Sequence, residues 1–296
     1  MGSGTWTTSS FTSYSTARGY SVDKSTGAIT NSLNVQDTYK QHHLAPELNP
    51  KGVIRECRDT EEHPNTIPVI LALDVTGSMG SSAVEVAKKL NVIMTELYSK
   101  VKDVEFLIMG IGDLAYDDAP IQASQFESDI RIAEQLDKIY FEGGGGGNAY
   151  ESYTAAWYFG LHQTDLDCWK RGKKGIIITL GDEPLNPYLP IRSLQNATGT
   201  ASQEVSDVET ESLYKEVTDK YDIYHIAVND RHNCFSRYSH MINSTFGKYL
   251  DSEHLREATL DSLANEIVDI VVHASESETE TNNGVNVNPE TGYISW

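Results

Sequence analysis

The sequence predicts an α/β fold with a Rossmann-like, doubly wound, mostly parallel sheet and helices on both faces. Continuous apolar runs at 67–73, 104–111 and 175–180 are typical of strands that are covered on both faces. Stretches with apolar residues at helical spacing separate these runs. Strands that alternate with helices form right-handed βαβ units, and such units build a parallel sheet.

The individual elements follow from the same patterns. Apolar residues from Ala83 to Leu97 recur at helical spacing, and Ser82 with Glu85 predicts a capping box at the start of that helix. A long loop at 182–208 contains three prolines. In chain order, the remaining predicted elements are a short edge strand at 120–123, helices at 130–139, 155–159 and 208–220, a strand at 223–228, a weak strand near residue 255 and a final helix at 260–271.

The composition divides the chain into three parts. Residues 1–60 are rich in Ser, Thr and Gly and poor in large aliphatic residues, which predicts an extended or flexible segment. Residues 61–274 have enough apolar residues for one sizeable core. Residues 275–296 have four Glu and no Lys or Arg, which predicts a flexible acidic tail. We therefore expect the domain at 61–274 to fold without either end.

The charge excludes several classes of partner. The chain has 23 Lys and Arg against 43 Asp and Glu, a net charge of −20, and no basic run. Nucleic acids and anionic membranes bind mainly through basic residues, so neither is expected as a partner. The three cysteines, far apart in the chain, do not suggest a disulfide framework, and no apolar run is long enough to span a bilayer. We expect a cytoplasmic protein.

Oxygen-bearing side chains follow the first predicted strand at every second position. Asp74, Thr76 and Ser78 can point toward one place, and Gly77 lets the backbone turn closely between them. Asp182 follows the strand at 175–180 and would lie next to Asp74 if the two strands are neighbours at the switch point of the sheet. Two carboxylates in one crevice repel each other unless a cation lies between them. These hard oxygen ligands suit Mg²⁺, Ca²⁺ or Mn²⁺.

The motif Asp74-Val-Thr-Gly-Ser78, placed between a buried strand and an amphipathic helix, resembles the metal-ion-dependent adhesion site (MIDAS) of von Willebrand factor type A (VWA) domains. Those domains usually read Asp-x-Ser-x-Ser, and Thr76 keeps the hydroxyl. An Asp after a later strand also belongs to the pattern, and Asp182 matches it. The resemblance covers roughly residues 64–273 and implies the same Rossmann-like fold.

The family usually supplies a further Thr from the loop before its third helix, and this chain departs from that pattern. The loop here is a run of five glycines at 143–147, and aligning the glycines puts Gly147 in place of the Thr. Asn148, Glu151 or Ser152 could take over the role of that Thr. Glu151 has a second interpretation, as an acid in the first turn of a helix that interacts with the helix dipole.

The resemblance implies a protein-interaction module rather than an enzyme. In MIDAS domains the protein leaves one metal position open, and an acidic side chain of the partner fills it. Intracellular members often work beside AAA+ ATPases or in larger assemblies. The alternative is a Mg²⁺-dependent phosphatase or hydrolase that uses the same acids. Aspartyl-phosphate phosphatases carry a second Asp two residues after the first, where this chain has Thr76. A third interpretation is a scaffold whose metal site is vestigial.

Overall fold

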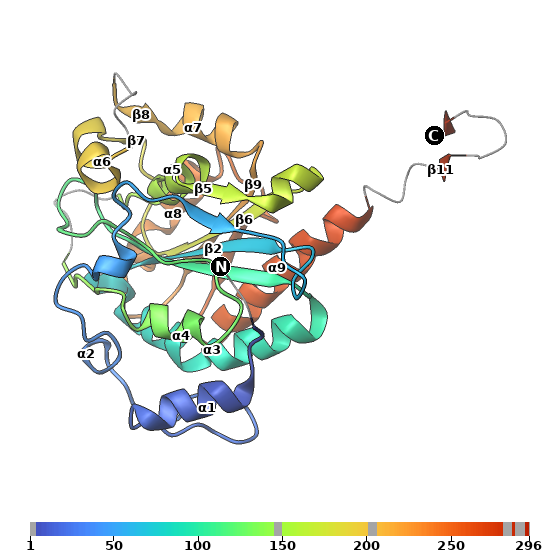
Figure 1. The fold of residues 1–296 in the computed structure, drawn as a ribbon. Coiled ribbons are helices and arrows are strands. Elements are labelled where there is room, and N and C mark those ends of the chain that lie inside the picture. Colours follow the sequence, from blue (N-terminus) through green and yellow to red (C-terminus); the bar gives the residue numbers. More distant parts are fainter. Residues whose placement is uncertain (1–3, 145–149, 201–205, 281–285, 288–293, 296) are drawn as a thin grey trace.

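A six-stranded sheet forms the centre of the molecule. The computed structural model describes residues 4–144, 150–200, 206–280, 286–287 and 294–295. The strand order is β10-β9-β6-β2-β3-β4 (Figure 1). Every neighbouring pair is parallel except β3 and β4. The strands are β2 (Ile67–Asp74), β3 (Val104–Ile111), β4 (Ile121–Ala123), β6 (Gly175–Gly181), β9 (Tyr221–Val228) and β10 (Leu255–Ala258). The predicted doubly wound, mostly parallel sheet is confirmed.

Helices cover both faces of this sheet (Figure 1). On one side lie α3 (Gly80–Lys100), α4 (Arg131–Leu136) and α9 (Leu263–Glu280), and on the other lie α5 (Thr154–His162), α7 (Thr210–Val217) and α8 (Phe235–Phe246). Alternate residues of β2 feed two separate cores: Leu71 packs into the first and Ile70 into the second. Burial on both faces explains why the strand sequence is apolar at every position.

Several local predictions were wrong. Helix α3 begins at Gly80, its N-cap residue Met79 makes no side-chain capping bond, and the predicted capping box of Ser82 and Glu85 is not formed. The expected long loop contains α6 (Ile191–Thr198), flanked by the antiparallel pair β7 (Tyr188–Leu189) and β8 (Val208–Glu209). Helix α8 was not predicted, because only three of its twelve residues are buried and apolar.

The N-terminal segment packs on the core, contrary to the expectation of a loose segment. Residues 4–60, here called the N-terminal strap, contain α1 (Thr8–Ala17), α2 (Val35–Thr38), a 3-10 turn (Pro46–Leu48) and β1 (Arg55–Cys57), which pairs with β5 (Thr164–Leu166). A few large side chains suffice to hold it although Ser and Thr dominate its composition. The buried apolar residues of this strap are Trp6, Phe11, Ile29, Tyr39, Ala45, Leu48 and Cys57.

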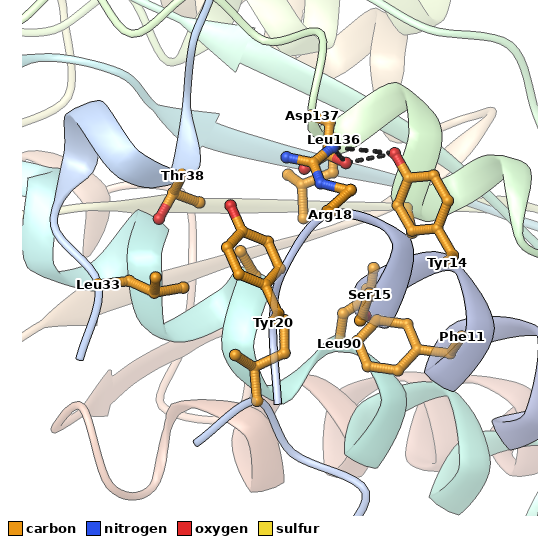
Figure 2. Close-up of a pocket in the computed structure, with 13 residues that line it drawn as sticks. Phe11, Tyr14, Ser15, Arg18, Tyr20, Leu33, Thr38, Leu90, Leu136 and Asp137 are labelled. Atoms are coloured by element: carbon orange, nitrogen blue, oxygen red, sulfur yellow. Dashed lines mark hydrogen bonds and ion pairs between the residues drawn. The ribbon is translucent and has the colours of Figure 1, made fainter. Parts of the chain in front are cut away.

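Polar contacts add to this packing. The indole N–H of Trp6 donates to Asn91 Oδ1 at 2.9 Å, and the Tyr39 hydroxyl donates to the carbonyl of Ala83 at 2.8 Å. Figure 2 shows Arg18 and Tyr14 of the strap meeting Asp137, which follows α4. A cavity of only about 20 Å³ remains between the strap and helices α3 and α4. The strap is therefore an integral layer on this face of the domain.

The C-terminal region continues beyond the predicted end of the domain. Helix α9 extends to Glu280, six residues past position 274. The short strands β11 (Asn286–Val287) and β12 (Ile294–Ser295) form an antiparallel pair. Among the described residues, no helix combines the length and the apolarity that a membrane span requires.

Candidate metal site

The two predicted acids lie at the same edge of the sheet. Asp74 is the last residue of β2, Asp182 follows β6, and these two strands are direct neighbours, with Leu73 paired to Leu180. The chain runs from β2 outward to β3 and β4, and from β6 outward to β9 and β10, so this edge is the switch point of the sheet. Both carboxyl groups are fully buried.

Each carboxylate accepts a hydrogen bond from one of the predicted hydroxyls. Thr76 Oγ1 donates to Asp74 Oδ1 at 2.5 Å, and the Thr76 backbone N–H donates to the same oxygen at 2.9 Å. Ser78 Oγ donates to Asp182 Oδ1 at 3.0 Å. A hydroxyl that donates its proton still has lone pairs available for a cation. The four residues therefore form two carboxylate–hydroxyl pairs made of hard oxygen atoms.

Two further residues hold the carboxylates in place, and sequence analysis missed both. The Tyr153 hydroxyl donates to Asp74 Oδ2 at 2.8 Å and accepts the backbone N–H of Glu183 at 3.3 Å. The backbone N–H of Cys234 donates to Asp182 Oδ2 at 2.6 Å. The structure explains the glycine directly before Asp182: a Cβ at Gly181 would lie 1.9 Å from the Tyr153 hydroxyl, so only glycine fits there.

The glycine-rich loop approaches the motif closely. The Gly77 N–H donates to the carbonyl of Gly144 at 2.8 Å, and a Cβ at Gly77 would lie 2.9 Å from the carbonyl oxygen of Gly143. Gly77 is therefore required by a backbone contact, in agreement with its predicted role. Asn148 and Gly147, two of the positions considered for the missing Thr, lie outside the described residues.

Glu151 lies beside this pair of acids with one oxygen unsatisfied. It is 2% exposed, it bridges to Leu185 in the loop after β6, and its Oε2 atom is buried without a hydrogen-bond partner. Burial, followed by the charge of Asp74, raises the pKa of Glu151 to about 11. Ser152 instead accepts the backbone N–H of Leu114 at 3.0 Å. Of the described candidates for the third contributor, Glu151 has the free oxygen.

The electrostatics of the site favour a positive charge. Burial, followed by the neighbouring charge of Asp182, raises the pKa of Asp74 to about 8, and burial raises the pKa of Asp182 as well. Without a cation, the proton that Asp74 holds below its pKa of about 8 reduces the repulsion between the two carboxyls. A divalent cation between Asp74 and Asp182 would displace that proton, and both carboxylates would then be attracted to the cation.

The residues present fit a hard divalent cation. Two carboxylates and two hydroxyls are the ligand types that Mg²⁺, Ca²⁺ and Mn²⁺ take. Within the described part of the chain, no group of three or more His, Cys, Asp and Glu side chains is arranged to hold a metal. The candidate site therefore depends on its hydroxyls as much as on its two acids.

The raised pKa values predict how stability changes with pH. Because the folded apo protein holds protons that the unfolded chain releases, its free energy of unfolding should fall as pH rises from 7 to 9, through the pKa of Asp74 at about 8. His225, whose pKa burial lowers to about 3, changes stability only below this window. Saturating Mg²⁺ should raise the melting temperature more at pH 9 than at pH 7.

Thermal unfolding in EDTA and in Mg²⁺ at pH 7, 8 and 9 checks this expectation. The variant Asp74→Asn has the same shape but cannot titrate, so it should make the pH dependence of the apo protein shallower, with Glu151, whose pKa is about 11, still contributing. An apo melting temperature that rises across this window, together with a Mg²⁺ effect independent of pH, would show that the buried acids do not bind protons as described.

Some solved structures of other proteins resemble this chain at low sequence identity. No protein-family model and no curated protein matches the chain. Similar solved structures include the pilus adhesin SpaC from Lactobacillus rhamnosus GG (12% identity, TM-score 0.43), which matches over 78% of this chain and 31% of SpaC. The vWF domain of the pilus tip protein Mfa5 from Porphyromonas gingivalis (11% identity, TM-score 0.40) matches over 77% of this chain and 99% of the Mfa5 chain. The SpRpn10 VWA domain (11% identity, TM-score 0.39) matches over 70% of this chain and 94% of the SpRpn10 chain.

Two of these three structures are VWA domains, the family that the Asp74–Ser78 motif resembles. At this level of identity the likeness concerns the fold alone. The chain spans about a third of the SpaC chain, so SpaC contains much that has no counterpart in the matched region.

Proposed function

We propose that this protein is an interaction module that binds a carboxylate of a partner protein through a divalent cation. Asp74, Thr76, Ser78 and Asp182 would hold the cation, directly or through water, with Glu151 in place of the missing Thr. The observation that supports this proposal best is the pairing of each buried carboxylate with one hydroxyl at the switch point of the sheet. Two carboxylates neutralise a divalent cation, so a coordination position that the protein does not fill, rather than excess positive charge, would draw an outside carboxylate oxygen.

The ion that fits these ligands is Mg²⁺, with Ca²⁺ and Mn²⁺ as close substitutes. The partner would supply an Asp or Glu side chain. The earlier expectation of an AAA+ ATPase or a larger assembly as partner stays a prediction. We do not propose the phosphatase alternative, because position 76 carries the hydroxyl of Thr, which donates to Asp74, where that chemistry needs a second carboxylate.

A matched pair of variants at Thr76 tests the role of the hydroxyl. Thr76→Ser keeps the oxygen and should leave Mg²⁺ affinity within about twofold. Thr76→Val keeps the shape, removes the oxygen and should weaken Mg²⁺ binding by about 10- to 100-fold. Isothermal titration with Mg²⁺ measures both affinities. Capture of cellular partners in Mg²⁺ and in EDTA should follow the same order, and equal capture by wild type and Thr76→Val in both solutions would refute the proposal.

Glu151→Gln tests the third contributor. The substitution keeps the size and removes the charge, so we expect Mg²⁺ affinity to fall by about 10-fold or more. Because the carboxyl of Glu151 is buried and protonated in the apo protein, the variant should fold as stably as wild type. Unchanged Mg²⁺ affinity would return Glu151 to the interpretation as an acid at the start of a helix.

A further inference from the structure

A cleft of about 380 Å³ is lined by Tyr150 and Ser152, the two chain neighbours of Glu151. Three loops at the carboxyl edge of the sheet build it: the turn after β3, with Asp113 and Tyr116; the segment before α5, with Tyr150; and the loop after β6, with Pro187 and Tyr188. Glu151, whose Oε2 atom is buried and unsatisfied, follows Tyr150 directly. Tyr150 and Ser152, on either side of Glu151 in the chain, both line the cleft, and the charge of Asp74 acts on Glu151. Glu151 therefore connects the cleft to the candidate metal site.

Hydrogen bonds fix the walls of this cleft. The backbone N–H of Leu114 donates to Ser152 Oγ at 3.0 Å and ties the first loop to the second. The side-chain amide of Asn186 donates to Thr154 Oγ1 at 2.6 Å and to the carbonyl of Tyr188 at 3.0 Å, which ties the third loop to the start of α5. The shape is therefore present before any ligand binds, which reduces the entropy lost on binding.

Tyrosines line the mouth of the cleft and are unusually exposed. In the described residues, the large hydrophobic side chains that are exposed are Tyr116 at 59%, Tyr188 at 43% and Ile54 at 52%. The two tyrosines are in this one cleft, together with Tyr150. Exposed aromatic side chains gathered in a concave place are typical of recognition sites.

The charge around the tyrosines is negative. Asp113 lines the cleft, and the charges of Asp113 and Glu183 both act on the buried carboxyl of Glu151. A partner rich in acidic residues would be repelled here, although one carboxylate is needed at the cation.

We propose that the tyrosine cleft receives an arginine or lysine side chain of the same partner segment whose carboxylate binds the cation. This inference rests on the proposed function. The aromatic faces of Tyr116 and Tyr188 attract a cation, and Asp113 adds Coulomb attraction. The aliphatic stem of the basic side chain packs on the tyrosine and proline surfaces. The recognised feature is thus a carboxylate and a basic residue a few positions apart.

Short synthetic peptides test this specificity with the full chain in saturating Mg²⁺. Each peptide has a Gly and Ser framework, one Asp, and one variable residue, Arg, Ala, Leu or Glu, placed one to four positions from the Asp. For at least one spacing, we expect the Arg peptide to bind about 5- to 30-fold more tightly than the Ala peptide, and the Glu peptide to bind weakest. Tyr116→Ala and Tyr188→Ala should remove the preference for Arg and leave Mg²⁺ affinity unchanged.

Ile54→Ala is the matched control, because it removes an exposed apolar side chain outside the cleft. It should leave the preference for Arg intact. Equal binding of the Arg and Ala peptides at every spacing, or tighter binding of the Leu peptide, would overturn the basic-residue inference while leaving the metal-dependent function standing. If no Asp peptide binds in Mg²⁺, both the inference and the proposed function fail.

Discussion

Asp74→Ala should abolish binding of the divalent cation, with a loss in Mg²⁺ affinity of at least about 100-fold, and with it the capture of any partner. Asp74 is fully buried, accepts hydrogen bonds from the hydroxyls of Thr76 and Tyr153, and lies close enough to Asp182 for the two charges to interact. Asp182→Ala should act in the same direction, because it removes the other carboxylate–hydroxyl pair.

The fold should survive the loss of Asp74. At pH 9, above the pKa of Asp74, removing one of two neighbouring buried acids relieves repulsion, so the apo variant should unfold there at the same temperature as wild type or higher. Asp118→Ala is a matched control, since Asp118 is an exposed acid on the loop after β3. It should leave Mg²⁺ affinity within about twofold, because exposed charges are screened. Mg²⁺ binding by Asp74→Ala as strong as that of wild type would place the cation elsewhere.

A chain that begins at residue 61 should fail to fold cooperatively. The N-terminal strap supplies seven buried apolar residues, including Trp6, Phe11 and Leu48. Each large buried apolar side chain contributes about 1.5–3 kcal/mol, and a whole domain is stable by only about 5–15 kcal/mol. Removing the strap would also expose the face of α3 that it covers. Circular dichroism and urea unfolding of the shortened chain would measure the effect.

Two point variants in α1 measure how much single side chains of the strap contribute to stability. Phe11→Ala should lower the free energy of unfolding by about 3–5 kcal/mol, because Phe11 is 2% exposed and packs against Trp6 at a ring distance of 5.6 Å. Ser13→Ala, at an exposed position of the same helix, should change it by less than about 0.5 kcal/mol. A shortened chain as stable as the full chain would show that the strap is not part of the fold.

The central sheet was predictable because its strands are buried on both faces. Strand β3 has the bounds that the apolar run at 104–111 predicted, and all six strands of the central sheet were predicted in the correct order along the chain. Asp74 and Asp182 could be placed together for the same reason: parallel strands bring their carboxyl ends to one edge, and both acids follow such strands.

Neither the packing of the strap nor the hydrogen bonds that hold Asp74 and Asp182 in place could be predicted from local sequence patterns. The apolar residues of the strap are scattered among Ser and Thr, so no periodicity marks the face that packs on α3. Tyr153 and Cys234 reach the acids only through tertiary contacts that span 79 and 52 positions. Local patterns do not contain such information. A contact through a backbone N–H, as at Cys234, leaves no requirement on residue type at all.

A crystal structure of the full chain grown in Mn²⁺, with its anomalous signal, tests the metal site most directly. The account predicts one strong anomalous peak at the carboxyl edge of the sheet between the Asp74–Thr76 and Asp182–Ser78 pairs, at about 2.0–2.3 Å from its direct oxygen ligands. The peak should vanish in Asp74→Asn. A crystal with Mn²⁺ at saturating concentration in which this position has no peak, and in which Thr76 and Ser78 still contact only the two carboxyls, would contradict the account.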